Sequence, residues 1–194
     1  MKRRIERADI LKPEVYAASR PERRRAITEL KRKRRMEVGP HATFHFESYE
    51  TMWQQVHEML HIEKGGEAQI PDELAAYNPL IPQGSELVAT VMFEIEDPVR
   101  RAAVLARLGG VEHTAFIEVN GVRSLGKAEE DQDRTSEEGK ASSVQFIHFP
   151  FEAAQIAAFK AAGARIVVGF THPAYSHMAV MPEPVREALA GDFA

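Results

Sequence analysis

The chain has 194 residues, of which 44% are hydrophobic and 28% are charged, a balance typical of a globular protein. It contains no cysteine, which excludes disulfides, iron–sulfur ligation and zinc sites built from thiolates. The formal net charge of −4 hides an asymmetry, because residues 1–35 carry 14 Lys and Arg against 5 Asp and Glu. We therefore expect a basic helical arm at 1–35 on an acidic body.

The first half of the chain predicts two longer helices with a strand between them. Residues 21–35 have a helical pattern with charge on most sides, and polarity alternates with period two from Met36 to Glu47, which predicts a strand. Ser48 is a suitable N-cap for a helix that ends at the two glycines 65–66. A short helix is expected at 71–76.

The second half predicts more strands, joined by turns or single helices. The expected strands are 86–96, 114–119, 143–149 and 165–171, and the expected helices are 97–110, 151–162 and 182–190. This order predicts an α+β fold with one mainly antiparallel sheet of about five strands, open or barrel-like, and helices packed on it. The whole of 1–194 is expected to form a single domain.

Residues 120–143 form the low-complexity stretch of the chain, acidic and poor in apolar residues. We expect a flexible acidic surface loop here. If the loop covers a site, Arg134 is its natural contact residue. No apolar run is long enough for a membrane span, and the basic N-terminus lacks the apolar centre of a signal peptide, so a cytoplasmic location is expected.

The sequence His57-Glu58-Met59-Leu60-His61 matches H-E-x-x-H, in which two histidines on a helix hold zinc and the glutamate acts as general base. The third ligand position of the extended motif holds Glu67 and not histidine. One strand precedes this helix, whereas such proteases hold their peptide substrate on a sheet. A zinc hydrolase is therefore the third hypothesis.

A metal site without protease activity is the first hypothesis. His41, His45 and Glu47 alternate along the strand before the H-E-x-x-H helix and so share one of its faces. The candidate ligands of this strand and helix are His41, His45, Glu47, His57, Glu58 and His61. Nitrogen and oxygen ligands suit zinc, manganese or non-haem iron. The structural alternative is a polar strand face turned to water.

Residues 171–177 follow an apolar strand and add His172, Tyr175 and His177 to the candidates. Functional loops commonly lie at the ends of strands. Alternatively, Pro173 makes a rigid turn here and the segment has only a structural role.

The basic arm suggests a partner. It contains Arg23-Arg24-Arg25 and the run KRKRR at 31–35, but no aromatic residues lie between these charges, which argues against nucleic acid. No glycine-rich nucleotide loop is present. We expect the arm to dock on the acidic body of its own chain or of a second subunit, as in a homodimer.

Several segments together resemble the uncharacterised bacterial family DUF3501. They are ADIL (8–11), LKRKRRMEVGPHATFHFE (30–47), HEML with Glu63 (57–63), ELAAYNPLIP (73–82), ELVATVMFEI (86–95), DRTS (133–136) and HPAY (172–175). The family more often has glutamine in place of His57 and arginine in place of His61. Its matching positions add Tyr77, Asn78 and Arg134 to Tyr175 as candidate binding residues.

The resemblance implies a setting more than an activity. Family members have no established activity, but their genes often lie beside rubrerythrin-like proteins and iron–sulfur oxidoreductases. The first hypothesis is therefore a redox-associated accessory protein that binds iron or zinc and works with such a partner. A metal-free interaction module that docks through its basic arm is the second.

Overall fold

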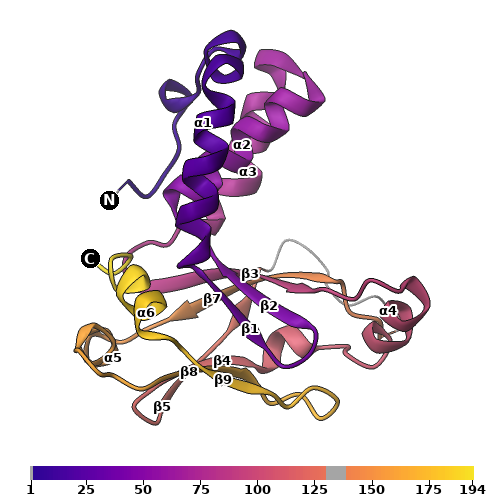
Figure 1. Cartoon of the computed structure of the whole chain (residues 1–194), viewed down its shortest axis with the longest axis vertical. Helices are drawn as coiled ribbons and strands as arrows, with labels where there is room; N and C mark the ends of the chain where they lie inside the picture. Colours follow the sequence, from indigo (N-terminus) through magenta and orange to yellow (C-terminus); the bar gives the residue numbers. More distant parts are fainter. Residues whose placement is uncertain (1, 130–138) are drawn as a thin grey trace.

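A helical arm, formed by residues 2–32 and 49–80, stands on two stacked β-sheets in the computed structural model, which describes residues 2–129 and 139–194 (Figure 1). The α-helices are α1 (Pro13–Arg32), α2 (Tyr49–Glu63), α3 (Ile70–Tyr77), α4 (Pro98–Leu105), α5 (Ala153–Lys160) and α6 (Glu183–Ala190). Short 3-10 helices are η1 (Arg7–Asp9), η2 (Gly66–Gln69), η3 (Asn78–Leu80) and η4 (Val111–Thr114). Within these described ranges, no helix has the length and apolar character of a membrane-spanning segment.

The strands pair in two antiparallel sheets. They are β1 (Arg35–Val38), β2 (Ala42–Phe46), β3 (Glu86–Phe93), β4 (Ala115–Val119), β5 (Val122–Leu125), β6 (Lys127–Ala128), β7 (Val144–Pro150), β8 (Ile166–Phe170) and β9 (Met178–Val180). In the described residues, one sheet has five strands in the order β1-β2-β3-β7-β6 and the other has four in the order β5-β4-β8-β9. The predicted α+β class and five-stranded antiparallel sheet are confirmed. Neither sheet closes into a barrel, and the second sheet was not predicted.

The main hydrophobic core lies between the two sheets. Phe44 of β2 and Phe170 of β8 bring their ring centroids to 5.2 Å across this space, and Ile117 and Val168 fill it from the second sheet. Because side chains alternate along a strand, the other faces of both sheets point away from this core. The outer face of the five-stranded sheet is the one that carries the arm.

The arm has a smaller core of its own. Met52 and Val56 of α2 and Ile70 of α3 pack there against Ile5 from the N-terminal segment. Val88 of β3 belongs to the same cluster, so this core also seats the arm on the sheet. In Figure 1, α1 and α2 run side by side up from the sheets, with the N-terminal segment beside them.

The structure departs from the predicted elements at the start of the arm helix, in the predicted strand 36–47 and in the predicted loop 120–143, among other places. The arm helix begins at Pro13 and passes through Pro21, which has no N–H to donate to the carbonyl of the exposed residue Ala17. The predicted strand at 36–47 is a hairpin, because Gly39 turns the chain with φ of +71°. The predicted loop 120–143 begins with strands β5 and β6, which pair with β4 and β7 despite their few apolar residues.

Candidate functional site

The predicted site residues lie in separate parts of the molecule. His41 lies at the turn of the β1–β2 hairpin, where Tyr175 contacts it, and His172 follows β8. His45 and Glu47 lie on the outer face of the five-stranded sheet. No three histidine, aspartate or glutamate side chains of the described residues are arranged to hold a metal ion. Arg134 lies outside the described residues.

Tyr175 locks the β1–β2 hairpin to the loop before β9. Its buried hydroxyl accepts hydrogen bonds from the backbone N–H groups of His41 and Ala42, both at 2.9 Å, and donates one to the carbonyl of Val38 at 2.9 Å. The ring of His41 stacks on Tyr175 with centroids 6.3 Å apart. These contacts give Tyr175 a structural role.

His172 has partners of the same kind. Its Nδ1 accepts a hydrogen bond from the backbone N–H of Ala174 at 3.2 Å, and its Nε2 lies 3.2 Å from the carbonyl of Gly109. A histidine with N–H on Nε2 satisfies both contacts. In this arrangement His172 holds the turn that positions Tyr175.

Glu47 and His45 lie as the strand pattern predicts, on the same face of β2. The buried carboxylate of Glu47 accepts hydrogen bonds from the hydroxyls of Thr51, at 2.5 Å, and Thr90, at 2.7 Å. Nε2 of His45 is buried and has no hydrogen-bond partner in the described structure. Burial lowers the pKa of His45, which favours a neutral ring.

The same face carries a charged group that sequence reasoning missed. Nδ1 of His148 lies 3.0 Å from Glu86 and its Nε2 lies 2.8 Å from Glu129. Burial opposes the charged form of His148, but the two carboxylates more than offset it and raise its pKa. His148 was missed because β7 pairs with β3, and this pairing brings its partners close. Residue spacing along the chain does not show which strands pair.

His57 is at the centre of the arm. Its Nδ1 lies 2.8 Å from the carbonyl of Trp53, and its Nε2 accepts a hydrogen bond from the backbone N–H of Leu11 at 3.0 Å. Both ring nitrogens are therefore engaged. Burial lowers the pKa of His57, so the ring is neutral at pH 7.

Glu58, the general base of the predicted motif, is held by a network. Arg20 of α1 donates to both of its carboxylate oxygens, at 2.9 and 2.8 Å, and the hydroxyl of Tyr16 donates at 2.6 Å. The hydrogen bonds from Arg20 lower the pKa of Glu58 to about 2. A carboxylate with this pKa is a weak base, and here it ties α1 to α2.

His61, one turn after His57, lines a cavity of about 530 Å³ at the tip of the arm. The cavity lies between the start of α1, the end of α2 and the start of α3, and its walls are mainly apolar. His57 and Tyr16 also line it. The two histidines of the motif therefore share a cavity, which the spacing of four residues predicts, without converging on one point.

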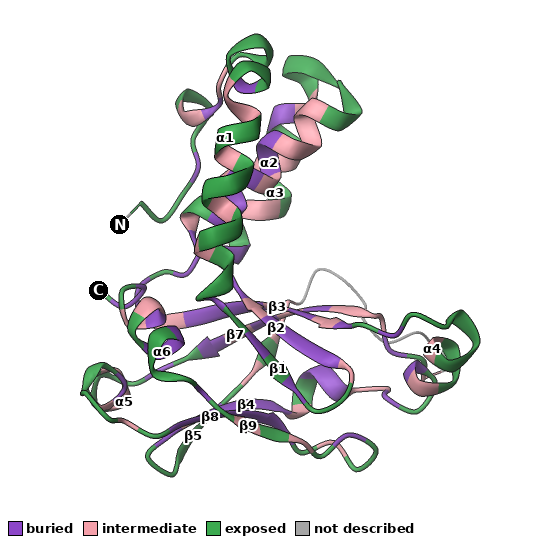
Figure 2. Ribbon diagram, in the orientation of Figure 1, coloured by how far each residue is buried: buried purple, intermediate pink, exposed green. Residues whose placement is uncertain are grey.

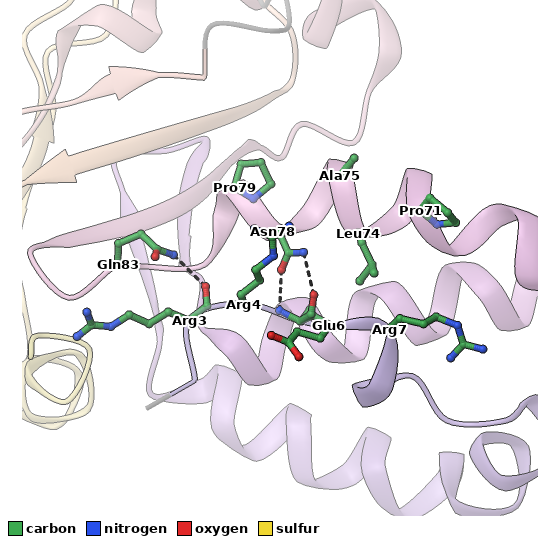
Figure 3. A pocket seen from close by; sticks show the side chains of 11 residues that line it. Arg3, Arg4, Glu6, Arg7, Pro71, Leu74, Ala75, Asn78, Pro79 and Gln83 are labelled. Atoms are coloured by element: carbon green, nitrogen blue, oxygen red, sulfur yellow. Dashed lines mark hydrogen bonds between the residues drawn. The ribbon is translucent and has the colours of Figure 1, made fainter.

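Asn78 and Tyr77 belong to the seat of the N-terminal segment. The side chain of Asn78 accepts from the backbone N–H of Ile5 at 2.7 Å and donates to its carbonyl at 3.0 Å, and Gln83 donates to the carbonyl of Arg3 (Figure 3). Tyr77 packs against the small core of the arm. The hydrogen bonds from Asn78 and Gln83 hold the backbone of the N-terminal segment as a neighbouring strand would.

An open groove of about 950 Å³ runs between this segment and α3 (Figure 3). Arg3 and Arg4 line one side, and Leu74 and Pro79 are among the residues that line the other. Arg3 and Arg4 make no ion pair within the described residues, whereas Arg7 pairs with Glu67. The groove therefore adds positive charge to the arm.

The part of α1 that does not pack on α2 is exposed to solvent, as Figure 2 shows, and carries several basic residues. Arg24, Arg25, Lys31 and Lys33 are exposed and form no salt bridge within residues 2–129 and 139–194. Other basic residues of the predicted arm do dock on the chain itself, namely Arg20 on Glu58, Arg7 on Glu67 and Arg34 on Asp192. Ion pairs with the rest of the chain thus account for only part of the positive charge of residues 1–35.

Comparison with known proteins identifies the family. The model of the family described as "Protein of unknown function (DUF3501)" matches residues 4–193. A crystal structure of a "novel protein of unknown function" from Burkholderia pseudomallei K96243 is similar, with a TM-score of 0.90 and 38% identity over 98% of this chain and 99% of that chain. Among curated proteins, none matches. The chain belongs to the DUF3501 family.

Proposed function

We propose that this protein is a binding module that engages an acidic partner protein through the exposed basic side of α1. The observation that carries the proposal is the set of exposed cations on α1 and just beyond it, which have no ion-pair partner in the described structure. Exposed Lys and Arg side chains keep their charged ends in water and without an ion pair, so they can pair with an acidic surface.

The distribution of charge supports this role. Residues 36–194 carry 24 Asp and Glu against 11 Lys and Arg, so the rest of the chain repels an acidic partner. Most of the Lys and Arg residues of 1–35 belong to the N-terminal segment and α1, which lie outside the two sheets (Figure 1). Such separation steers an acidic partner to the arm and speeds its association at low salt.

The first partners to test are those that the family resemblance suggests, a rubrerythrin and an iron–sulfur oxidoreductase encoded nearby. The variant Arg24→Gln/Arg25→Gln is expected to bind the partner about tenfold more weakly, because two exposed ion pairs contribute about 1–2 kcal/mol together at low salt. Titration by biolayer interferometry at low and high salt measures the effect. Added salt should weaken wild-type binding more than binding of the variant.

The matched control is Arg100→Gln/Arg107→Gln, which removes the same charge from exposed positions in and just after α4. This control should bind as the wild type does. Equal losses in both variants would contradict a role for α1. If the wild type binds itself instead, analytical ultracentrifugation will show a salt-sensitive dimer, and the acidic partner is then a second copy.

A second proposal is the redox-associated accessory role with iron or zinc bound at the outer face of the five-stranded sheet. Its specific support is the buried and unpartnered Nε2 of His45, next to the carboxylate of Glu47. Glu47 already accepts two hydroxyl donors, so further ligands would have to come from outside the described residues. For this reason the metal role ranks below partner binding.

Elemental analysis of protein purified without chelators tests the metal proposal. The expected result is about one ion per chain, lost in His45→Ala because a buried imidazole is a strong ligand for these metals. His113→Ala is the control, since the side chain of His113 is 71% exposed and distant in sequence from this strand. Absence of iron, zinc and manganese after attempted reconstitution would end this proposal.

A further inference from the structure

The cavity at the tip of the arm has the size and lining of a small-molecule site. Its volume of about 530 Å³ lies within the range of about 300–1,000 Å³ that such sites occupy. Apolar side chains come from the N-terminal segment, from α1 and α2, and from the start of α3. They include Ile10, Leu11, Ala17, Leu60 and Ile70.

The charges at this cavity balance. Glu67 at the rim is paired with Arg7, whose Nη2 lies 2.5 Å from its carboxylate. Glu14 and Lys64 also line the cavity, have opposite charges and make no ion pair within the described chain. Because an unpaired charge is costly to bury, a site with balanced charges and apolar walls favours a neutral ligand.

Among the aromatic polar side chains that line the cavity, His61 is the one that is free to bind a ligand within the described structure. The ring of His61 lies edge-on to Tyr16, with centroids 5.9 Å apart, and makes no hydrogen bond in the part of the chain that the structure describes. His57 cannot serve in the same way, because Trp53 and Leu11 engage both of its nitrogens. His61 is therefore the group that can orient a bound molecule.

We infer that this cavity binds a small neutral molecule with an apolar body and one polar group that hydrogen-bonds His61. An apolar body displaces water from the walls, and one well-placed polar contact sets its orientation. This site is independent of the basic side of α1, so either proposal can fail while the other stands.

Isothermal titration calorimetry with three probes that share a naphthalene body tests the inference: 2-naphthol, 2-naphthoate and 2-naphthylmethylammonium. The neutral probe is expected to bind about tenfold more tightly than either charged probe. Replacing His61 by phenylalanine keeps the ring and removes the hydrogen bond, so 2-naphthol should bind about fivefold more weakly.

A matched pair of variants locates the site. Ala17→Phe places a ring in the cavity and should abolish binding of 2-naphthol, whereas Ala18→Phe makes the same change at the next exposed position, outside the lining, and should leave it unchanged. Circular dichroism checks that both variants fold, and the His61 variant decides the question if Ala17→Phe does not. No binding of 2-naphthol, equal binding in Ala17→Phe or preference for a charged probe would each overturn the inference.

Discussion

Replacing Arg34 by methionine is expected to lower the free energy of unfolding by about 3–5 kcal/mol, the typical cost of breaking a buried ion pair from one side. The side chains of Arg34 and Asp192 are 7% and 1% exposed, and Nη2 lies 2.5 Å from Oδ2. The guanidinium also donates to the carbonyls of Phe46 and Glu47, at 3.1 and 2.8 Å. All of these acceptors lose their donor in the variant.

The neighbouring residue supplies the control for this experiment. Arg35→Met makes the same chemical change, but Arg35 is exposed and, among the described residues, pairs only with exposed Glu37, so its effect should stay within about 0.5 kcal/mol. Urea denaturation measures both variants. Equal midpoints for the two would show that the buried pair contributes nothing.

The stability that the Arg34 variant loses relative to the wild type should also depend on pH. Burial raises the pKa of Asp192 above its ordinary value even with Arg34 present, and Arg34 acts to lower it. Without Arg34 the pKa rises further, so the folded variant binds a proton that the unfolded chain releases. Its stability is therefore greatest below the unfolded pKa of Asp192 and is lost as pH rises. The deficit should be smaller at acid pH than at pH 8.

Tyr175→Phe is expected to cost about 2–4 kcal/mol, because one lost hydroxyl leaves three backbone groups without their partner. Two of them, the N–H groups of His41 and Ala42, lie where the hairpin turns. Urea denaturation measures the loss in the free energy of unfolding. Amide hydrogen exchange should be faster at these two residues than along the rest of the β1–β2 hairpin.

Tyr77→Phe is the matched change, since the half-buried Tyr77 makes no hydrogen bond through its hydroxyl within the described residues. It should alter stability by about 0.5 kcal/mol or less. If the Tyr175 variant is as stable as the wild type, with unchanged hydrogen exchange at the turn, then the hydroxyl of Tyr175 does not hold the hairpin.

Local patterns were sufficient to predict most elements. The alternation around Phe44 and the cap at Ser48 correctly placed a strand and the helix that follows it. The second sheet could not be predicted in this way, because whether β4 and β8 pair with each other or join the longer strands depends on distant contacts. The hairpin was missed because Gly39 lies inside a run whose polarity alternates throughout.

The candidate site was harder to predict, for a related reason. Strand period placed His45 and Glu47 on one face, and helix period placed His57 and His61 at one cavity. The groups that engage these side chains come from far along the chain, as with Thr90 on Glu47 and Arg20 on Glu58. Spacing within a motif carries no information about such partners.

The connection between the arm and the sheet has a consequence for binding. Only two residues separate α1 from β1, and one of them is the buried Arg34, which anchors this junction to the end of β2 and to the C-terminal segment. The helix therefore cannot swivel on a loose hinge. The helix that carries the cations is therefore already ordered, so binding a partner costs no entropy for ordering the arm, and the complex should form in one rigid-body step.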